Sequence, residues 1–412
     1  MPGRSSLRGS DLRGAVRLAT DATAGLTDLV EAMHARIARL PGSRHLDLEG
    51  RAGGLTGLVY HTIRGVTRVV GGTIDALLGL IAPALDPHRI NECEARPERE
   101  GLVAALNGVL GDYLAATGNP LAIKMAFRVQ GKPLALEPGA LAARFPEAPS
   151  RLLVVVHGLC MSDVQWRREG HDHGAALAAD LGYTAVYLHY NSGLHISING
   201  RSLARELERL LELWPCPMER FALLGHSMGG LVARSAQHYG IQAGHRWPSR
   251  LDDMIFLGTP HHGAPLERAG NWVDVILGAN PYAAPFARLG KLRSAGITDL
   301  RHGNIVDEDW VGRDRFARAA DRRQRVVLPP RVRYHALAGC LGARGDLKGQ
   351  LLGDGLVPLA SALGQHADAA RALSIPKDRQ WVGYRTNHLE LLSRPAVYAR
   401  LRRSLAKACA KT

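Results

Sequence analysis

The chain has 412 residues, of which 46% are hydrophobic and 5% aromatic, and its formal net charge is +14. This length can enclose a full hydrophobic core and still carry an additional subdomain. The charge favours anionic partners such as acidic lipid headgroups, but no nucleic-acid-binding motif accompanies it, so no nucleic-acid partner is expected. The five cysteines are scattered and odd in number, which argues against a disulfide framework and against a zinc knuckle.

The N-terminal part of the chain is expected to be a helical extension over residues 1–117. Apolar residues at helical spacing predict helices over 16–40, 55–81 and 102–114. The second of these helices contains charged residues that make it a poor transmembrane span. It either packs against its two neighbours or rests on an anionic membrane or lipid surface. No secretory signal is apparent, so we expect a cytoplasmic protein, with peripheral membrane contact as the alternative.

The remainder of the chain, residues 118–412, alternates strand-like and helix-like segments. Such an order is typical of an α/β fold with a mostly parallel central sheet flanked by helices. Short apolar runs predict the strands, which we place at 125–129, 151–156, 183–190, 220–224, 254–257 and 334–339.

Residues 225–229 read G-x-S-x-G, with Ser227 at the centre. A strand-like run precedes the motif and a plausible helix follows it. This context predicts a nucleophile elbow, in which a sharp turn exposes the serine hydroxyl above the sheet. Ser227 is therefore the predicted nucleophile, and the amide of Met228 is a predicted oxyanion donor.

An elbow of this kind is followed along the chain by an acid and then by a histidine. Asp354 lies between two glycines in a loop, and His388 lies in a polar turn before a helix. We predict that Asp354 orients His388, which acts as general base and then as general acid. The weaker alternatives are Asp274, Asp307 and Asp309 for the acid, and His226, His261 and His262 for the base. We expect His226 to pack locally, and His261 and His262 to line the rim of the pocket.

A second oxyanion donor is expected in the loop after the strand at 151–156. Leu159 is the predicted donor through its backbone N–H, and Cys160 is the alternative. Residues 264–330 hold a large share of the scarce aromatic side chains and interrupt the regular strand order. We interpret this segment as a cap or lid over the nucleophile, with a surface insertion as the alternative.

The ordered motifs resemble the α/β-hydrolase superfamily, in particular its lipase and esterase branch, which includes bacterial proteins similar to GPI inositol-deacylase. The resemblance covers roughly Leu121 to the C-terminus. It implies an α/β-hydrolase fold and ester hydrolysis without a cofactor or metal. The motifs that carry it are residues 157–159, 225–230, 258–263, 353–358 and 387–389.

The expected function is hydrolysis of carboxylic esters of lipid-like substrates, through an acyl-enzyme on Ser227. An acyltransferase or an amidase would use the same three residues. A lipid-surface binding protein with an accessory hydrolase domain is the alternative outside the enzyme class. Seven arginines between Arg313 and Arg331 concentrate the positive charge. We interpret them as a solvated face, with an anionic membrane surface as the second interpretation.

Overall fold

The computed structural model describes residues 9–38, 97–146, 150–264, 294–313 and 321–406, with 61, 63, 65, 67, 68, 72 and 75. The chain divides into two compact units. The smaller unit comprises residues 1–93 and 114–122, and the larger unit comprises residues 94–113 and 123–412. The boundary that we predict between residues 117 and 118 stays a prediction.

In the smaller unit, helix α1 spans Gly9–Ala38, as the sequence predicts for this part of the chain. Arg13 and Arg17 each place a guanidinium Nε 2.7 Å from a carboxylate oxygen of Asp75. Hydrogen bonds from the two guanidinium groups hold the pKa of Asp75 below its usual value. Most of the second predicted helix lies outside the described residues.

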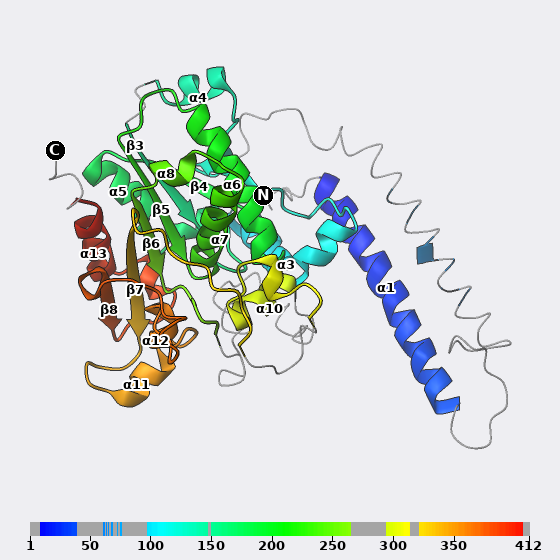
Figure 1. Cartoon of the computed structure of the whole chain (residues 1–412). Helices are drawn as coiled ribbons and strands as arrows, with labels where there is room; N and C mark the ends of the chain where they lie inside the picture. Colours follow the sequence, from blue (N-terminus) through cyan, green and yellow to red (C-terminus); the bar gives the residue numbers. More distant parts are fainter. Residues whose placement is uncertain are drawn as a thin grey trace. The chain divides into compact units, whose positions relative to one another are not determined.

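The larger unit is built on one sheet of eight strands, in the order β2-β1-β4-β3-β5-β6-β7-β8 (Figure 1). Strand β1 pairs antiparallel with β2 and β4, and all other neighbours are parallel. The mostly parallel sheet that the sequence predicts is therefore confirmed. The strands are β1 Ala126–Val129, β2 Lys132–Pro133, β3 Arg151–Val156, β4 Thr184–His189, β5 Arg220–His226, β6 Asp253–Leu257, β7 Arg333–Cys340 and β8 Gln380–Tyr384.

Helices cover both faces of this sheet. The α-helices are α3 Pro97–Ala116, α4 Pro138–Arg144, α5 His173–Leu181, α6 Ile196–Glu212, α7 Met228–Gln242, α8 Trp247–Arg250, α10 Ala295–His302, α11 Leu347–Leu352, α12 Leu359–Ala362 and α13 Pro395–Ala406. Short 3₁₀ helices are η1 Asp163–Trp166, η3 Asp307–Asp309, η4 Lys377–Arg379 and η5 Glu390–Leu392.

Two apolar clusters lie on opposite faces of the sheet because side chains alternate along each strand. In β3, Val154 belongs to the cluster that includes residues of α6 and α7. The next residue, Val155, belongs to the cluster that includes residues of α5 and α13. Figure 1 shows α6 and α7 on one side of the sheet, and α5 and α13 on the other. A central strand covered on both faces needs the continuous apolar run found in β3.

The described parts of the predicted cap pack into the larger unit. Ile297 and Leu300 of α10 are fully buried in the cluster that contains α6 and α7. The Asp299 carboxylate accepts hydrogen bonds from the Ile196 amide and the His195 ring, each at 2.9 Å. Residues 265–293 and 314–320 lie outside the described residues, so the role of a cap stays a prediction.

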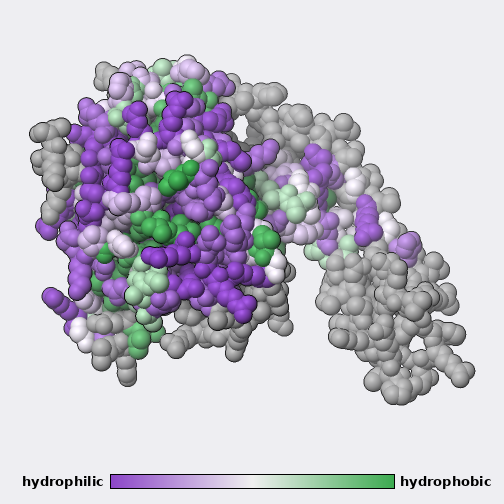
Figure 2. Space-filling view, in the orientation of Figure 1, coloured by the Kyte–Doolittle hydropathy of each residue, from purple (hydrophilic) through white to green (hydrophobic). Residues whose placement is uncertain are grey.

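Figure 2 shows hydrophilic residues over most of the described surface of the larger unit on the visible face, with smaller hydrophobic patches among them. Among the helices within the described ranges, none combines the length and the apolar character needed to cross a membrane.

Candidate active site

Ser227 lies at the turn between β5 and α7, with φ 54° and ψ −123°. A positive φ is unusual for a residue other than glycine and marks a backbone held in place by its surroundings. The turn requires Gly229, because a Cβ there would lie 2.2 Å from the Val156 carbonyl oxygen. It also requires Gly225, where a Cβ would lie 2.5 Å from the Gly230 nitrogen. These close approaches explain why the motif needs both glycines.

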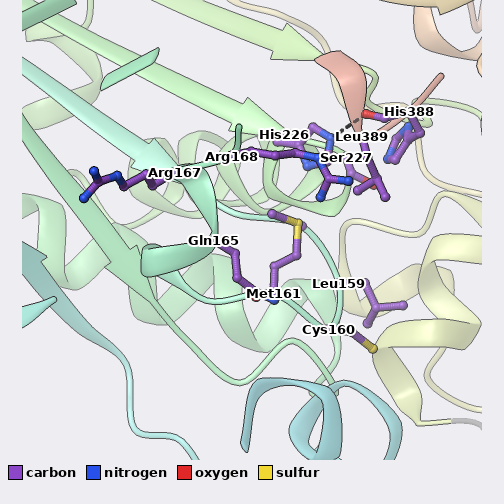
Figure 3. Close-up of a pocket in the computed structure, with 11 residues that line it drawn as sticks. Leu159, Cys160, Met161, Gln165, Arg167, Arg168, His226, Ser227, His388 and Leu389 are labelled. Carbon is purple, nitrogen blue, oxygen red and sulfur yellow. Dashed lines mark hydrogen bonds between the residues drawn. The ribbon is translucent and has the colours of Figure 1, made fainter. Parts of the chain in front are cut away.

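A cavity of about 120 Å³ opens at this turn. Figure 3 shows Ser227, His226, His388 and Leu389 gathered at one side of the cavity, with Met161 extending toward them. The cavity thus brings Ser227 and His388 together, although they are far apart in the sequence. The complete lining comprises Gly158, Leu159, Cys160, Met161, Gln165, Arg167, Arg168, His226, Ser227, His388 and Leu389.

His388 and Asp354 are joined by a hydrogen bond of 2.7 Å between His388 Nδ1 and Asp354 Oδ2. The other carboxylate oxygen of Asp354 accepts the amides of Leu356 and Val357, at 3.0 and 2.8 Å. Because the carboxylate accepts, Nδ1 carries the proton and Nε2 of a neutral His388 presents a lone pair. Neither His388 Nε2 nor Ser227 Oγ has a hydrogen-bond partner among the described residues.

The alternative acids do not contact His388. Asp307 forms an ion pair with Arg201. Asp309 accepts the backbone amides of Ile305, Val306 and Gln324. Asp274 lies outside the described residues. Of the described candidates, Asp354 is the carboxylate that the fold brings to His388.

The predicted oxyanion donors lie on two neighbouring segments. Met228 is the first residue of α7, so its N–H has no acceptor within the helix. The loop after β3 passes close to Ser227, since a Cβ on Gly158 would lie 3.1 Å from the Ser227 Cβ. The Cys160 amide already donates to Ser192 Oγ at 3.1 Å. This hydrogen bond favours Leu159 over Cys160 as the second donor, and both assignments stay predictions.

His226 is a buried, neutral neighbour of the site. Burial, followed by the charge of nearby His388, holds the pKa of His226 well below its usual value. Its Nε2 lies 3.3 Å from the His388 carbonyl oxygen, and the two rings are 4.7 Å apart between centroids. A neutral imidazole that donates to this carbonyl stabilises the turn that carries His388.

Four lining residues were not predicted from the sequence, namely Met161, Gln165, Arg167 and Arg168. All four follow the predicted oxyanion loop in the sequence, and this proximity is the feature from which their place in the cavity could have been predicted. Arg168 brings positive charge to the cavity, whereas the Arg167 side chain extends away from Ser227 (Figure 3), and none of the lining residues is acidic. Arg168 Nε is buried without a hydrogen-bond partner among the described residues.

A buried ionic network lies behind this loop. Arg128 Nη1 donates to Glu100 at 2.8 Å and to Asp163 at 3.0 Å. His189 Nδ1 lies 3.2 Å from the same Asp163 oxygen. Two buried carboxylates and an imidazole at this spacing suit a divalent cation. Here the Arg128 guanidinium supplies the positive charge between the carboxylates, so the network ties α3 and β1 to η1.

His261 and His262 differ from the expectation that they line the rim of the Ser227 pocket. Both line a separate cavity, together with Arg234 of α7. No residue lines both cavities.

Comparison with known proteins gives one family. Residues 149–326 match the model of the PGAP1-like alpha/beta domain, a range that contains Ser227 but ends before Asp354 and His388. No match was found among curated proteins.

Similar solved structures include lipases and esterases. Bacillus licheniformis lipase BlEst2 in mature form is 22% identical to this chain. The match covers 63% of this chain and 92% of the lipase chain, and its TM-score is 0.38. Aspergillus fumigatus lipase B is 13% identical, with coverages of 66% and 58% and a TM-score of 0.38. The Pyrococcus furiosus esterase Pf2001 is 11% identical, with coverages of 63% and 83% and a TM-score of 0.37. The family match over residues 149–326 agrees with the predicted resemblance to proteins similar to GPI inositol-deacylase, and the strand order agrees with the predicted α/β-hydrolase fold.

Proposed function

We propose that this chain is a serine hydrolase that cleaves carboxylic esters through an acyl-enzyme on Ser227. The observation that carries the proposal is the buried hydrogen bond between His388 and Asp354, with His388 and Ser227 lining one cavity. A serine hydroxyl is a weak nucleophile until a base accepts its proton. The acid–base pair supplies that base in a fixed tautomer.

In the first half of the proposed reaction, His388 Nε2 takes the proton of Ser227 Oγ as the oxygen attacks the ester carbonyl. The negative charge that forms on the carbonyl oxygen is stabilised by the amides of Leu159 and Met228. His388 then donates its proton to the departing alcohol. The acyl group remains on Ser227 as an ester.

In the second half, water enters the place of the alcohol and gives a proton to His388. The resulting hydroxide attacks the acyl-enzyme, and the same amides stabilise the second tetrahedral intermediate. Ser227 leaves with the proton from His388, and the acid product is released. Each step uses only residues of this chain and water.

The lining of the cavity supports an ester of lipid type with an anionic group. Leu159, Met161 and Leu389 offer an apolar wall for an acyl chain. Arg168 offers positive charge beside Ser227 that no lining acid neutralises. A phosphate or carboxylate near the ester would gain a charge-assisted hydrogen bond there.

The test is ester turnover by the full chain and by Ser227→Ala, over a panel of 4-nitrophenyl esters of increasing acyl length. We expect turnover by the wild type, with a preferred chain length. Ser227→Ala should lose at least about a thousandfold in kcat. Equal rates for the two proteins would refute the assignment of the nucleophile. Matched amide substrates and added alcohol acceptors distinguish amidase or acyltransferase activity on the same residues.

A further inference from the structure

Arg234 is a buried arginine that forms no salt bridge with any residue in the described part of the chain. It lies on α7 and is 5% exposed. Its Nη1 lies 3.4 Å from His261 Nδ1, and its Nη2 lies 3.5 Å from the Val326 carbonyl oxygen. Both distances are long for hydrogen bonds, and Nε has no partner among the described residues. Among the described residues, this buried guanidinium therefore has weak hydrogen bonds and no close carboxylate, whereas a buried charge usually needs such partners.

The imidazole beside it also lacks an acceptor. His261 is 1% exposed and receives the Arg234 contact on Nδ1. Because arginine can only donate, Nδ1 acts as the acceptor and the proton of a neutral His261 lies on Nε2. Burial and the charge of Arg234 hold the pKa of His261 well below its usual value, so the ring is neutral. His261 Nε2 is therefore a buried donor, without a partner among the described residues.

Both residues line a cavity of about 40 Å³. One water needs roughly 10–15 Å³, so this space admits a group of a few heavy atoms. Three more arginines line the same cavity, namely Arg323, Arg325 and Arg371. Arg323 belongs to the arginine-rich segment, and its side chain is 13% exposed, so it is not the solvated residue that the sequence suggests.

Acidic groups near the cavity are already engaged. Asp309 is the one carboxylate among the lining residues, and its oxygens accept three backbone amides. Asp321 does not line the cavity, and it binds Arg323 at 2.7 Å and Arg371 at 3.2 Å. Neither contacts Arg234 within salt-bridge distance. Among the described residues that line the cavity, arginines therefore outnumber carboxylates.

The positive charge of Arg323 lies close to Arg234, and a bound anion would stabilise both groups. Burial and the nearby Arg323 lower the pKa of Arg234 to about 10, which still leaves the guanidinium charged at neutral pH. The guanidinium groups of Arg234 and Arg323 repel each other, and the neutral imidazoles of His261 and His262 carry no negative charge that would offset this repulsion. A bound oxyanion accepts several such donors at once, as phosphate does in arginine-lined sites.

We propose that the cavity lined by Arg234, His261 and Arg323 binds a small oxyanion of the phosphate or sulfate class. The anion accepts hydrogen bonds from Arg234 Nε–H and His261 Nε2–H and neutralises the arginine cluster. It thereby ties the segment around Arg323 to helix α7. The site shares no residue with the Ser227 cavity and does not depend on the proposed esterase function.

Binding is tested by isothermal titration calorimetry of the full chain with sodium phosphate, sodium sulfate and sodium chloride at constant ionic strength. We expect saturable binding of one phosphate or sulfate per chain and no such binding of chloride. A fourth titration uses glycerol 3-phosphate. If the chain binds glycerol 3-phosphate as well as phosphate, the cavity accepts the terminal phosphate group of a larger molecule. If it binds phosphate alone, the ligand is the free ion. Heats that are the same for phosphate and chloride overturn the proposal.

Two variants and a control locate the ion. Arg234→Gln should weaken phosphate binding about tenfold or more, which is the effect of losing a charge-assisted hydrogen bond. Arg325→Gln removes an exposed lining charge and keeps the fold testable if Arg234→Gln does not fold. Arg322→Gln, in the same segment but not lining the cavity, is the matched control and should bind as the wild type does. Unchanged affinity in the folded lining variants, or equal loss in Arg322→Gln, overturns the proposal.

Discussion

Hydrogen bonds to both of its oxygens hold the carboxylate of Asp354 in place. One carboxylate oxygen accepts from His388 Nδ1, and the other accepts the amides of Leu356 and Val357. The tight turn around Gly353 and Gly355, both at positive φ, makes the second set of contacts available. The carboxylate is therefore fixed before any substrate arrives, which is what orientation of a general base requires.

Asp354→Asn is expected to lower kcat by about 10²–10⁴-fold, because an amide in this position favours the wrong tautomer of His388. The measurement is steady-state turnover of a soluble ester, with the melting temperature as a check on folding. Asp307→Asn is the matched control, since Asp307 pairs with Arg201 and has no contact with His388. If Asp307→Asn were inactive and Asp354→Asn near normal, the acid would be misassigned.

The place of some functional residues in the structure can be predicted from the sequence, and that of others cannot. Ser227, Asp354 and His388 stand in a fixed order with recognisable loops, so their places could be predicted. Arg234 and His261 carry no local signal. Their burial comes from the packing of α7 against the chain after β6, which only the tertiary structure shows.

At the scale of elements, the elbow depends on contact between β3 and the first turn of α7. Gly229→Ala should destabilise the fold by about 1–3 kcal/mol or more, because its Cβ would overlap the Val156 carbonyl oxygen at 2.2 Å. Chemical denaturation measures the effect. Gly139→Ala is the control, since nothing lies within 4 Å of a Cβ there. Equal stability of the two variants would show that the elbow is less tightly packed than described.

Strands with a continuous apolar run could be predicted from the sequence, whereas short or partly buried elements could not. The apolar run of β3 and the strand before Ser227 match their predicted positions. Strand β8 was missed, because four of its five residues are only partly buried and its pattern does not alternate clearly. Strand β2 has two residues, too few for any periodic signal. Helix α4 likewise shows little pattern, with one buried residue in seven.

At the scale of the whole molecule, buried histidines predict a pH dependence of stability. Burial lowers the pKa of His157 to about 3 and that of His173 to about 4. Below pH ~6.5 the unfolded chain binds protons that the folded chain does not, so the free energy of unfolding falls as the pH falls. This loss begins above the range in which carboxylates titrate.

The melting temperature should therefore decrease between about pH 6.5 and 4.5, by an amount equivalent to at most about 1.4 kcal/mol per pKa unit for each histidine. Differential scanning fluorimetry across this range measures it. His173→Gln should flatten part of the slope if it keeps the hydrogen bond to the Leu391 carbonyl. A melting temperature that is constant over this range would contradict the neutral, buried state of these rings.

We also propose that the N-terminal part of the chain contacts anionic lipid surfaces. Glu94–Tyr113 belongs to the larger unit and contributes Ala105 and Val109 to its core, so the deletion that tests this removes residues 1–93 only. We expect the deletion to reduce turnover of vesicle-held esters more than turnover of a soluble ester. Vesicle cosedimentation and the melting temperature are measured in parallel. Equal loss of both activities in a folded protein would contradict the surface role.

In the proposed function, Ser227 is the activated nucleophile of a serine hydrolase. The most direct measurement is fluorophosphonate labelling of the full chain, followed by intact-mass and peptide mass spectrometry. We predict one covalent adduct per chain, located on the peptide that contains Ser227, and no adduct on Ser227→Ala. His388→Ala should label much more slowly, because the base is absent. Labelling of another residue, or no labelling of the folded wild type, would contradict the role of Ser227 as nucleophile.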